Sequence, residues 1–222
     1  MSLKTSNLAF KARVDREVHN EIMRKAVVKA QETIGTNRQK MVDELGHWEE
    51  WRDLSKQIRN HVLANLDAYL YQLSEKVMEN GGKVYFAETA EEATEYIRQV
   101  ALKKNAKKIV KSKSMVTEEI GLNGVLEKEG MQVIETDLGE YLLQISGDKP
   151  SHIVVPAIHK DRHQIRKDLH EKLGYEGAET PEDMTRFVRE KIRQDFLEAD
   201  IGISGCNFAV AETGSVCLVT NE

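Results

Sequence analysis

The sequence of 222 residues contains few cysteines and prolines and no long apolar run. Its two cysteines, Cys206 and Cys217, are too few for a disulfide framework or for a four-thiolate zinc or iron–sulfur site. No run of about 18 apolar residues is present, so a membrane span is not expected. The N-terminus lacks the apolar core of a secretory signal. These absences favour a cytoplasmic protein that holds no metal in this chain.

Positive charge is not in excess. The chain has 32 lysines and arginines against 37 aspartates and glutamates, which gives a net charge of −5. A protein that binds duplex nucleic acid carries a basic excess, so nucleic-acid binding is not expected. Hydrophobic residues make up 40% of the chain, which is typical of a folded globular protein.

The first part of the chain has a helical period. Apolar residues recur every four positions from Phe10 to Ile34, and Gly35-Thr36-Asn37 is expected to interrupt that helix. A second long helix is expected from Trp48 to Val77, ending at Asn80-Gly81-Gly82. We therefore expect a helical N-terminal extension over residues 1–82.

Two tryptophans, Trp48 and Trp51, lie one turn apart at the start of that second helix. They either anchor the helix to a neighbouring part of the protein or form a docking site for a partner. The sequence leaves both interpretations open.

After Gly82 short apolar segments alternate with helical ones, which predicts a mostly parallel sheet flanked by helices, an α/β fold. The expected helices begin near Thr89, which has the capping-box partner Glu92, and near Thr117, Asp161 and Thr180. The expected strands are 83–87, 108–111, 131–135, 152–156 and 201–204, and two short ones flank residues 212–215. We expect the last three strands to pair as an antiparallel edge. This α/β domain would cover residues 83–222.

Polar residues follow several of these strands, at the sheet edge where such folds bind ligands. Lys111, Lys113 and Ser114 suit an anion site, or else form a solvated turn. Glu135 and Asp137 suit substrate orientation or acid–base work, or else cap a surface loop.

Two further places carry the same ambiguity. His159, just past the strand predicted at 152–156, suits a proton carrier or metal ligand, although a lone histidine is usually neither. Glu212 and Thr213 lie in a turn between the last two strands, which is either a polar hairpin or part of a site. If the loops converge, the lysines would hold the anionic part of a small ligand and the acids would orient a hydroxyl or accept a proton.

Several ordered blocks resemble the lactate-utilization proteins, the LUD-domain family. They are KSKSMVTEEIGLN at 111–123, ETDLGEYLLQ at 135–144, PSHIVVPAIHKD at 150–161 and GCNFAVAETGS at 205–215. The helical lead-in HWEEWRDLSKQIRNHVLANLDAYL resembles the iron–sulfur branch of that family. The resemblance covers nearly the whole chain.

The resemblance implies a core similar to the NagB/RpiA/CoA-transferase-like α/β fold. A glutamate often sits in that group where Glu212 lies here, and in some CoA-transferases it is the nucleophile. By that likeness Glu212 would point into a cleft as a catalytic residue. Thr213 would lie beside it, and Gly214 would let backbone approach closely.

The resemblance also implies a function. A full-length relative would serve oxidation of L-lactate to pyruvate in bacteria by electron transfer between partner subunits, with two [4Fe–4S] clusters in a ferredoxin-like region. The present chain is then expected to be the N-terminal part of a longer protein, to hold no cluster, and to bind a small anionic ligand or other lactate-utilization subunits.

Two alternatives remain open at this point. One is a stand-alone isomerase or CoA-transferase-like enzyme that uses Glu212. The other is a structural module in which the long helices form an interface, and an oligomer is compatible with each of these interpretations.

Overall fold

The computed structural model describes residues 10–152 and 155–219, and the chain divides into two compact units. The first, called here the sheet unit, contains residues 87–205 together with the N-terminal segment through Val28. The second, called here the helical unit, contains Lys29–Phe86 and Cys206–Asn221. Residues 206–219 thus belong with the long helices rather than with the parallel strands.

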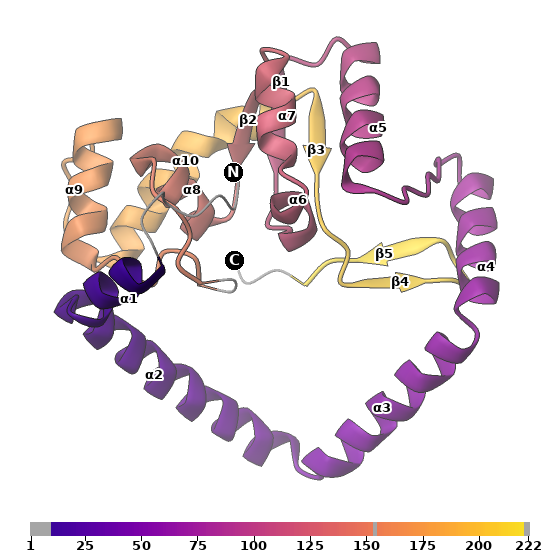
Figure 1. Cartoon of the computed structure of the whole chain (residues 1–222), viewed down its shortest axis with the longest axis horizontal. Coiled ribbons are helices and arrows are strands. Elements are labelled where there is room, and N and C mark those ends of the chain that lie inside the picture. The colour runs from indigo at the N-terminus through magenta and orange to yellow at the C-terminus, as the bar shows by residue number, and fades with distance from the viewer. Residues whose placement is uncertain (1–9, 153–154, 220–222) are drawn as a thin grey trace. The chain divides into compact units, whose positions relative to one another are not determined.

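The sheet unit is built on three parallel strands in the order β2-β1-β3. They are β1 (Lys108–Lys111), β2 (Gln132–Glu135) and β3 (Ile201–Ile203) (Figure 1). The parallel α/β sheet predicted from the sequence is confirmed. The antiparallel edge predicted for 201–204 is wrong. A helical crossover between β2 and β3 carries the chain back across the sheet, so that β3 runs beside β1 in the same direction.

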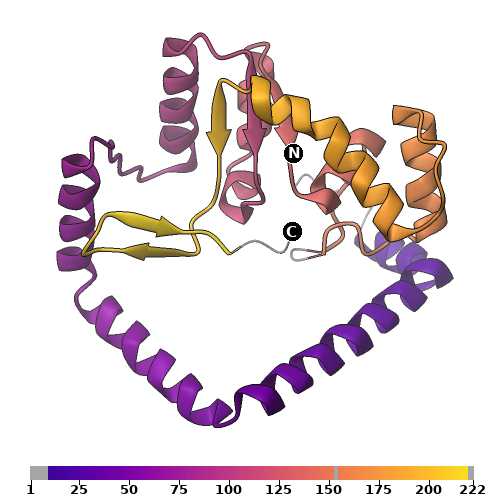
Figure 2. The same cartoon turned by 180° about the vertical axis from the view of Figure 1, so that it is seen from behind.

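Helices cover both faces of this sheet. One apolar cluster joins Ile109 and Val133 to α5 (Ala90–Lys103) and α7 (Leu122–Lys128). A second joins Val110 and Ile134 to α8 (Leu138–Ser146), α9 (Arg162–Leu173) and α10 (Pro181–Glu198). α7 is on the near side of the sheet in Figure 1 and α10 is on the near side in Figure 2. β1 and β2 are buried on both faces, because successive residues of a strand point to opposite sides and helices cover each side, whereas β3 is only half-buried or exposed.

Local capping chemistry sets several helix ends as the sequence predicts. The Thr89 hydroxyl accepts a hydrogen bond from the Glu92 N–H and begins α5, and Asp161 forms a full capping box with Gln164 at the start of α9. The sequence predicts a helix from about Thr117 to Glu129 and offers Gly121 as its breaking point. The structure divides it there, where φ is +67°, into α6 (Met115–Glu119) and α7.

Two predicted strands are not found as expected. Residues 83–87 form no strand, and Val84, Tyr85 and Phe86 are exposed. A strand needs a partner for its backbone hydrogen bonds, and no described strand pairs with this segment. Of the strand predicted at 152–156, residues 153–154 lie outside the described part of the chain, and the described neighbours form bends and turns.

Four helices precede residue 83 in the described part of the chain: α1 (Phe10–Val18), α2 (Glu21–Leu45), α3 (Trp48–Ala64) and α4 (Leu66–Glu79). The break predicted at Gly35-Thr36-Asn37 is wrong, since α2 continues through it. One glycine in a helix costs only about 1 kcal/mol, which is too little to end a long helix. The break lies instead at Gly46 and His47, which both have positive φ.

The helical unit also contains a two-stranded antiparallel hairpin, β4 (Phe208–Val210) and β5 (Ser215–Cys217), as predicted for these two segments. Its turn lies against the end of α4 in both views (Figures 1 and 2). Asn80 Nδ2 donates to the Thr213 carbonyl at 2.9 Å. Gly214 has φ +70°, and a Cβ there would lie 2.7 Å from the Lys76 carbonyl carbon. The close backbone approach expected at Gly214 is therefore made to α4.

Among the residues that the structure describes, no helix is both long enough and apolar enough to cross a membrane.

Replacing Gly214 tests the packing of the β4–β5 turn against α4. Gly214→Ala combines a positive φ with a clash against α4, so we expect it to lower the free energy of unfolding by more than about 1 kcal/mol. Gly35→Ala is the matched control, because Gly35 lies within α2 with open space around it and should gain about 0.5–1 kcal/mol. Urea denaturation measures both, and equal stability of the two variants would contradict the packing described here.

Candidate functional site

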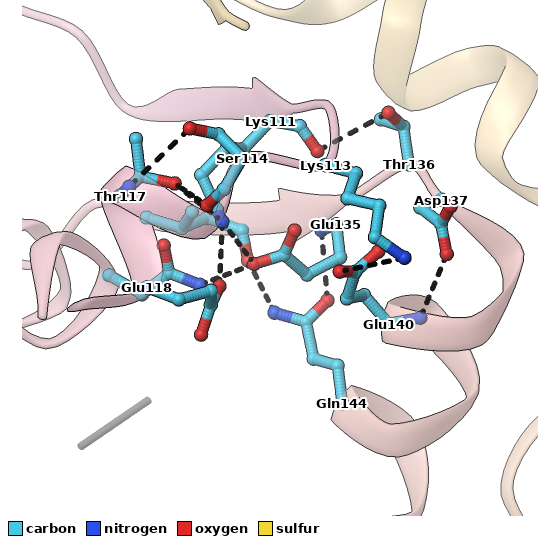
Figure 3. A network of polar contacts seen from close by, with 12 residues as sticks. Lys111, Lys113, Ser114, Thr117, Glu118, Glu135, Thr136, Asp137, Glu140 and Gln144 are labelled. Atoms are coloured by element: carbon cyan, nitrogen blue, oxygen red, sulfur yellow. Dashed lines mark hydrogen bonds and ion pairs between the residues drawn. The ribbon is translucent and has the colours of Figure 1, made fainter. Parts of the chain in front are cut away.

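A fully buried lysine lies at the carboxyl end of the central strand. The register of the sheet places Lys111 directly opposite Glu135, and the two side chains are 0% and 5% exposed. Lys111 Nζ lies 2.9 Å from Glu135 Oε1 and 2.8 Å from Glu118 Oε1 (Figure 3). It also donates to Thr117 Oγ1 at 3.2 Å. One ammonium group is thus held by two carboxylates and a hydroxyl.

The alternation of the strands explains why these groups meet. Lys111 lies two residues after Ile109, and Glu135 two after Val133, so all four point to the same face of the sheet. That face is covered by the segment from α6 to α7, which supplies Glu118 and Asn123. Asn123 Nδ2 donates to Glu135 Oε1 at 2.6 Å.

Gln144 of α8 completes the edge strand β2. Its Oε1 accepts the Glu135 N–H at 3.1 Å, and its Nε2 donates to the Val133 carbonyl at 2.8 Å. The side-chain amide therefore serves two backbone groups of β2 that no strand pairs within the described sheet. This keeps Glu135 fixed where Lys111 meets it.

Burial and charge act against each other in this pair. Burial lowers the pKa of Lys111, but the carboxylates of Glu135 and Glu118 outweigh burial and leave that pKa above its usual value. Burial raises the pKa of Glu135, and the Lys111 ammonium offsets only part of this rise. Lys111 consequently stays charged, and Glu135 takes up a proton more readily than an exposed glutamate does.

A second charged group lies beside the first. Lys113 Nζ is 3.7 Å from Glu140 Oε1, in the first turn of α8 (Figure 3). Asp137 caps that helix, and its Oδ1 accepts from the Gly139 and Glu140 N–H groups at 2.9 and 3.2 Å. Burial raises the pKa of Glu140 to about 8, and its contact with the Asp137 carboxyl adds to the rise. Glu140 therefore exchanges a proton near neutral pH.

Several acceptor oxygens of these side chains are buried without a hydrogen-bond donor among the described residues. They are Glu135 Oε2, Asn123 Oδ1 and Glu140 Oε2. Buried polar atoms normally have partners, so oxygens of this kind suit a group that brings its own donor, such as a hydroxyl. Protonated Glu140 can itself donate to Asp137.

Two further residues at this edge have structural roles. Ser114 caps α6, and its Oγ accepts from the Thr117 N–H at 3.4 Å. Thr136, which the sequence did not single out, donates from Oγ1 to the Lys111 carbonyl at 3.2 Å. The structure thus brings Lys111, Lys113, Ser114, Glu135 and Asp137 together, and their ligand-binding role stays a prediction.

His159 also belongs to the sheet unit, but its side chain hydrogen-bonds with Ser151 and not with the Lys111–Glu135 pair. Its Nδ1 lies 2.8 Å from Ser151 Oγ, and burial lowers its pKa. Neighbouring Lys160 pairs with Asp148 and Asp168. Among the described residues no hydrogen bond or ion pair joins His159 to Lys111 or Glu135, and its predicted role in ligand binding stays a prediction.

Glu212 and Thr213 belong to the helical unit. Glu212 is exposed in the turn between β4 and β5, and Thr213 Oγ1 donates to Ser215 Oγ at 2.9 Å. Their convergence with the lysines of the sheet unit and the catalytic role of Glu212 stay predictions.

The described residues offer no group of three or more histidine, cysteine, aspartate or glutamate side chains that could hold a metal ion. Cys206 and Cys217 are both free and exposed.

The residues that sequence reasoning missed are Glu118, Asn123 and Gln144. The helix that carries Gln144 was not predicted, and a surface loop was one of the two interpretations given for Glu135 and Asp137. One signal was present: Asp137 followed by Glu140 and a run of apolar residues resembles the start of a capped helix.

Removal of the buried ammonium should be costly. Lys111→Met leaves Glu118 and Glu135 facing each other without a cation, and we expect it to lower the free energy of unfolding by about 3–5 kcal/mol. Lys103→Met, at an exposed position of α5, is the control and should change it little. Adding Glu135→Gln to Lys111→Met should restore part of the loss. If urea denaturation shows no such recovery, the pair is not the cause.

The raised pKa of Glu140 predicts a dependence of stability on pH. The folded protein binds the Glu140 proton more tightly than the unfolded chain, so this contribution is complete below about pH 4.5 and is lost as pH rises through about 8. Glu140→Gln should therefore gain stability relative to the parent chain as pH rises across that window. Glu119→Gln, at an exposed position, should follow the parent curve. Parallel curves for Glu140→Gln and the parent would refute the assignment.

Comparison with known proteins gives the family. The LUD domain matches residues 70–222. The chain is 74% identical to "Uncharacterized electron transport protein YkgF" of Escherichia coli (strain K12), across 100% of this chain and 47% of that protein. It is 60% identical to "Lactate utilization protein B" of Bacillus cytotoxicus and 59% identical to the protein of that name of Bacillus cereus (strain B4264), with the same coverage.

The chain thus spans about half the length of these curated relatives. No solved structure matches it. Because the match covers most of the chain, including every element of the sheet unit from α5 to β3, the chain belongs to the LUD domain family.

Proposed function

We propose that this chain serves bacterial L-lactate utilization as the ligand-binding or partner-binding α/β part of an electron-transport protein. The names of the Bacillus and Escherichia coli relatives support the two halves of this proposal, lactate utilization and electron transport. In the proposal L-lactate is oxidised to pyruvate and electrons pass between partner subunits. The cytoplasmic location expected from the sequence is part of the same proposal.

The proposal places two [4Fe–4S] clusters outside this chain. A cluster of that type needs four thiolates, whereas the chain has two cysteines, which are exposed and free. The residues in hand do not fit a cluster, so no step of the proposal passes through one here. Other lactate-utilization subunits are the proposed partners.

Within the chain, the proposed ligand site is the cluster around Lys111 and Glu135. The observation that carries it is the set of buried acceptor oxygens, Glu135 Oε2, Asn123 Oδ1 and Glu140 Oε2, together with the Lys113 ammonium beside Glu140. A small 2-hydroxy acid matches both features. Its carboxylate would meet Lys113, which is 23% exposed, and its hydroxyl would donate to one of the acceptors.

Such a site distinguishes L-lactate from pyruvate. Pyruvate carries a carbonyl oxygen in place of the hydroxyl and so cannot donate a hydrogen bond. When pyruvate is bound, the buried acceptor oxygens of the site receive no hydrogen bond from the ligand, and this lowers the affinity for pyruvate. Glu140, whose pKa is raised to about 8, exchanges a proton near neutral pH, and in its deprotonated form it can accept a hydrogen bond from the hydroxyl.

Calorimetric titration of the chain with L-lactate and pyruvate tests this site. We expect saturable binding of L-lactate and weaker binding of pyruvate. Lys113→Gln should weaken L-lactate binding about ten- to a hundredfold, since it removes one charge-assisted hydrogen bond. Lys104→Gln, an exposed lysine at the end of α5, is the matched control and should leave the affinity unchanged.

Melting temperatures of both variants show whether the fold is kept. Binding of L-lactate that is equal in Lys113→Gln and the parent chain would remove Lys113 from the site. Absence of binding to either acid would overturn the proposed ligand class, and would favour the partner-binding form of the proposal.

A further inference from the structure

The helical unit has a basic, tryptophan-lined groove that the proposed ligand site does not use. It runs along one face of α3 with a volume of about 470 Å³. Its lining residues recur at helical spacing of three and four: Trp48, Trp51, Arg52, Ser55, Lys56, Arg59, Asn60 and Leu63. The groove is therefore one continuous stripe of a single helix, and it lies wholly within the helical unit.

The stripe and its flank expose large apolar side chains to solvent. Trp51 is 50% exposed and Leu63 is 67% exposed, and Leu54 and Ile58 on the adjoining flank are 46% and 56% exposed. None of the residues of α3 is buried. Aromatic side chains and arginines together are the residue types that contribute most to protein–protein interfaces.

The charged side chains that line the groove are all basic. Trp48 Nε1 is buried and has no acceptor among the described residues. Lys56 and Arg59 make no ion pair within the part of the chain that the structure describes, while Arg52 pairs with Glu49 at 2.8 Å. The Arg38 guanidinium lies 5.5 Å from the centre of the Trp48 ring and adds further positive charge. No acidic residue lines the groove.

We propose that the α3 groove docks an acidic amphipathic helix of a partner protein. Carboxylates on that helix would accept from Arg59 and Lys56, and its apolar face would cover Trp51 and Leu63. This matches the known mode in which a helix lies in a groove with apolar anchors at spacings of three and four residues. The inference does not depend on the ligand site proposed above.

Charge selects this occupant over others. A second copy meeting the same face of α3 would oppose the basic side chains of one chain to those of the other, which is unfavourable. A membrane or nucleic-acid surface would favour a helix with a net positive charge. α3 instead carries three acidic residues, Glu49, Glu50 and Asp53, against three basic ones, so its attraction is local to the groove.

The chain provides its own probe for the test, because its two tryptophans both line the groove. The ligand is a synthetic helical peptide with leucines on one face and glutamates along both flanks. We expect saturable binding with a shift of tryptophan emission to shorter wavelength. The double variant Lys56→Glu/Arg59→Glu should weaken binding at least about tenfold, through loss of charge-assisted hydrogen bonds. Rising salt should also weaken binding of the parent chain.

The matched control is Lys40→Glu, which changes an exposed charge on α2 in the same unit and should bind the peptide like the parent chain. Circular dichroism verifies that both variants keep their helices. The proposal is overturned by an equal response to a peptide with lysine in place of glutamate, or by no emission change. It is also overturned if anionic vesicles give the same shift, or if light scattering shows a dimer that Arg59→Glu dissociates.

Discussion

Lys111 is charged and has no exposure to solvent, and this constraint organises the functional end of the sheet. An isolated ammonium group in an apolar interior is too costly to persist, so the fold must bring carboxylates to it. The register of β1 and β2 supplies Glu135, and the turn of α6 supplies Glu118. Asn123 and Gln144 then fix Glu135 from two further helices. Neighbouring Lys113 and Glu140 share this edge, so the same scaffold that satisfies the buried charge also positions the side chains of the proposed ligand site.

Local chemistry in the sequence predicts much of this fold, and it fails where distant segments decide. Thr89, Asp161 and Thr180 begin helices as expected, and the strands that end at Lys111 and Glu135 were both placed correctly. The apolar composition of residues 83–87 suggested a strand, but a strand also requires a partner, which local sequence does not encode. The proximity of Lys111 to Glu135 follows from the sheet register. The contributions of Glu118 and Asn123 depend on how the segment after β1 folds back, which no spacing revealed.

The two units differ in how they satisfy their apolar residues. The sheet unit buries leucines, valines and isoleucines on both faces of its strands. In contrast, α2, α3 and α4 contain no buried residue among those described, although their apolar side chains recur at helical spacing. The sequence left Trp48 and Trp51 open between an anchor and a docking site. Trp51 is exposed within the helical unit, and Lys56 and Arg59 beside it make no ion pair among the described residues, which favours the docking interpretation for Trp51. Trp48 is half-buried, with the Arg38 guanidinium over its ring.

The order of the strands has a consequence for how the chain acquires its structure during synthesis. β1 and β2 are separated only by the two short helices α6 and α7 and can pair early. β3 pairs with the other side of β1 only after α8, α9 and α10 have been made, because Ile201 is the partner of Ile109. Until then the central strand presents an unpaired edge while the chain is still on the ribosome. The Asp200 carboxylate accepts the Lys107 and Lys108 N–H groups at 2.7 and 3.0 Å. These two hydrogen bonds would form late, when β3 pairs with β1 and completes the sheet.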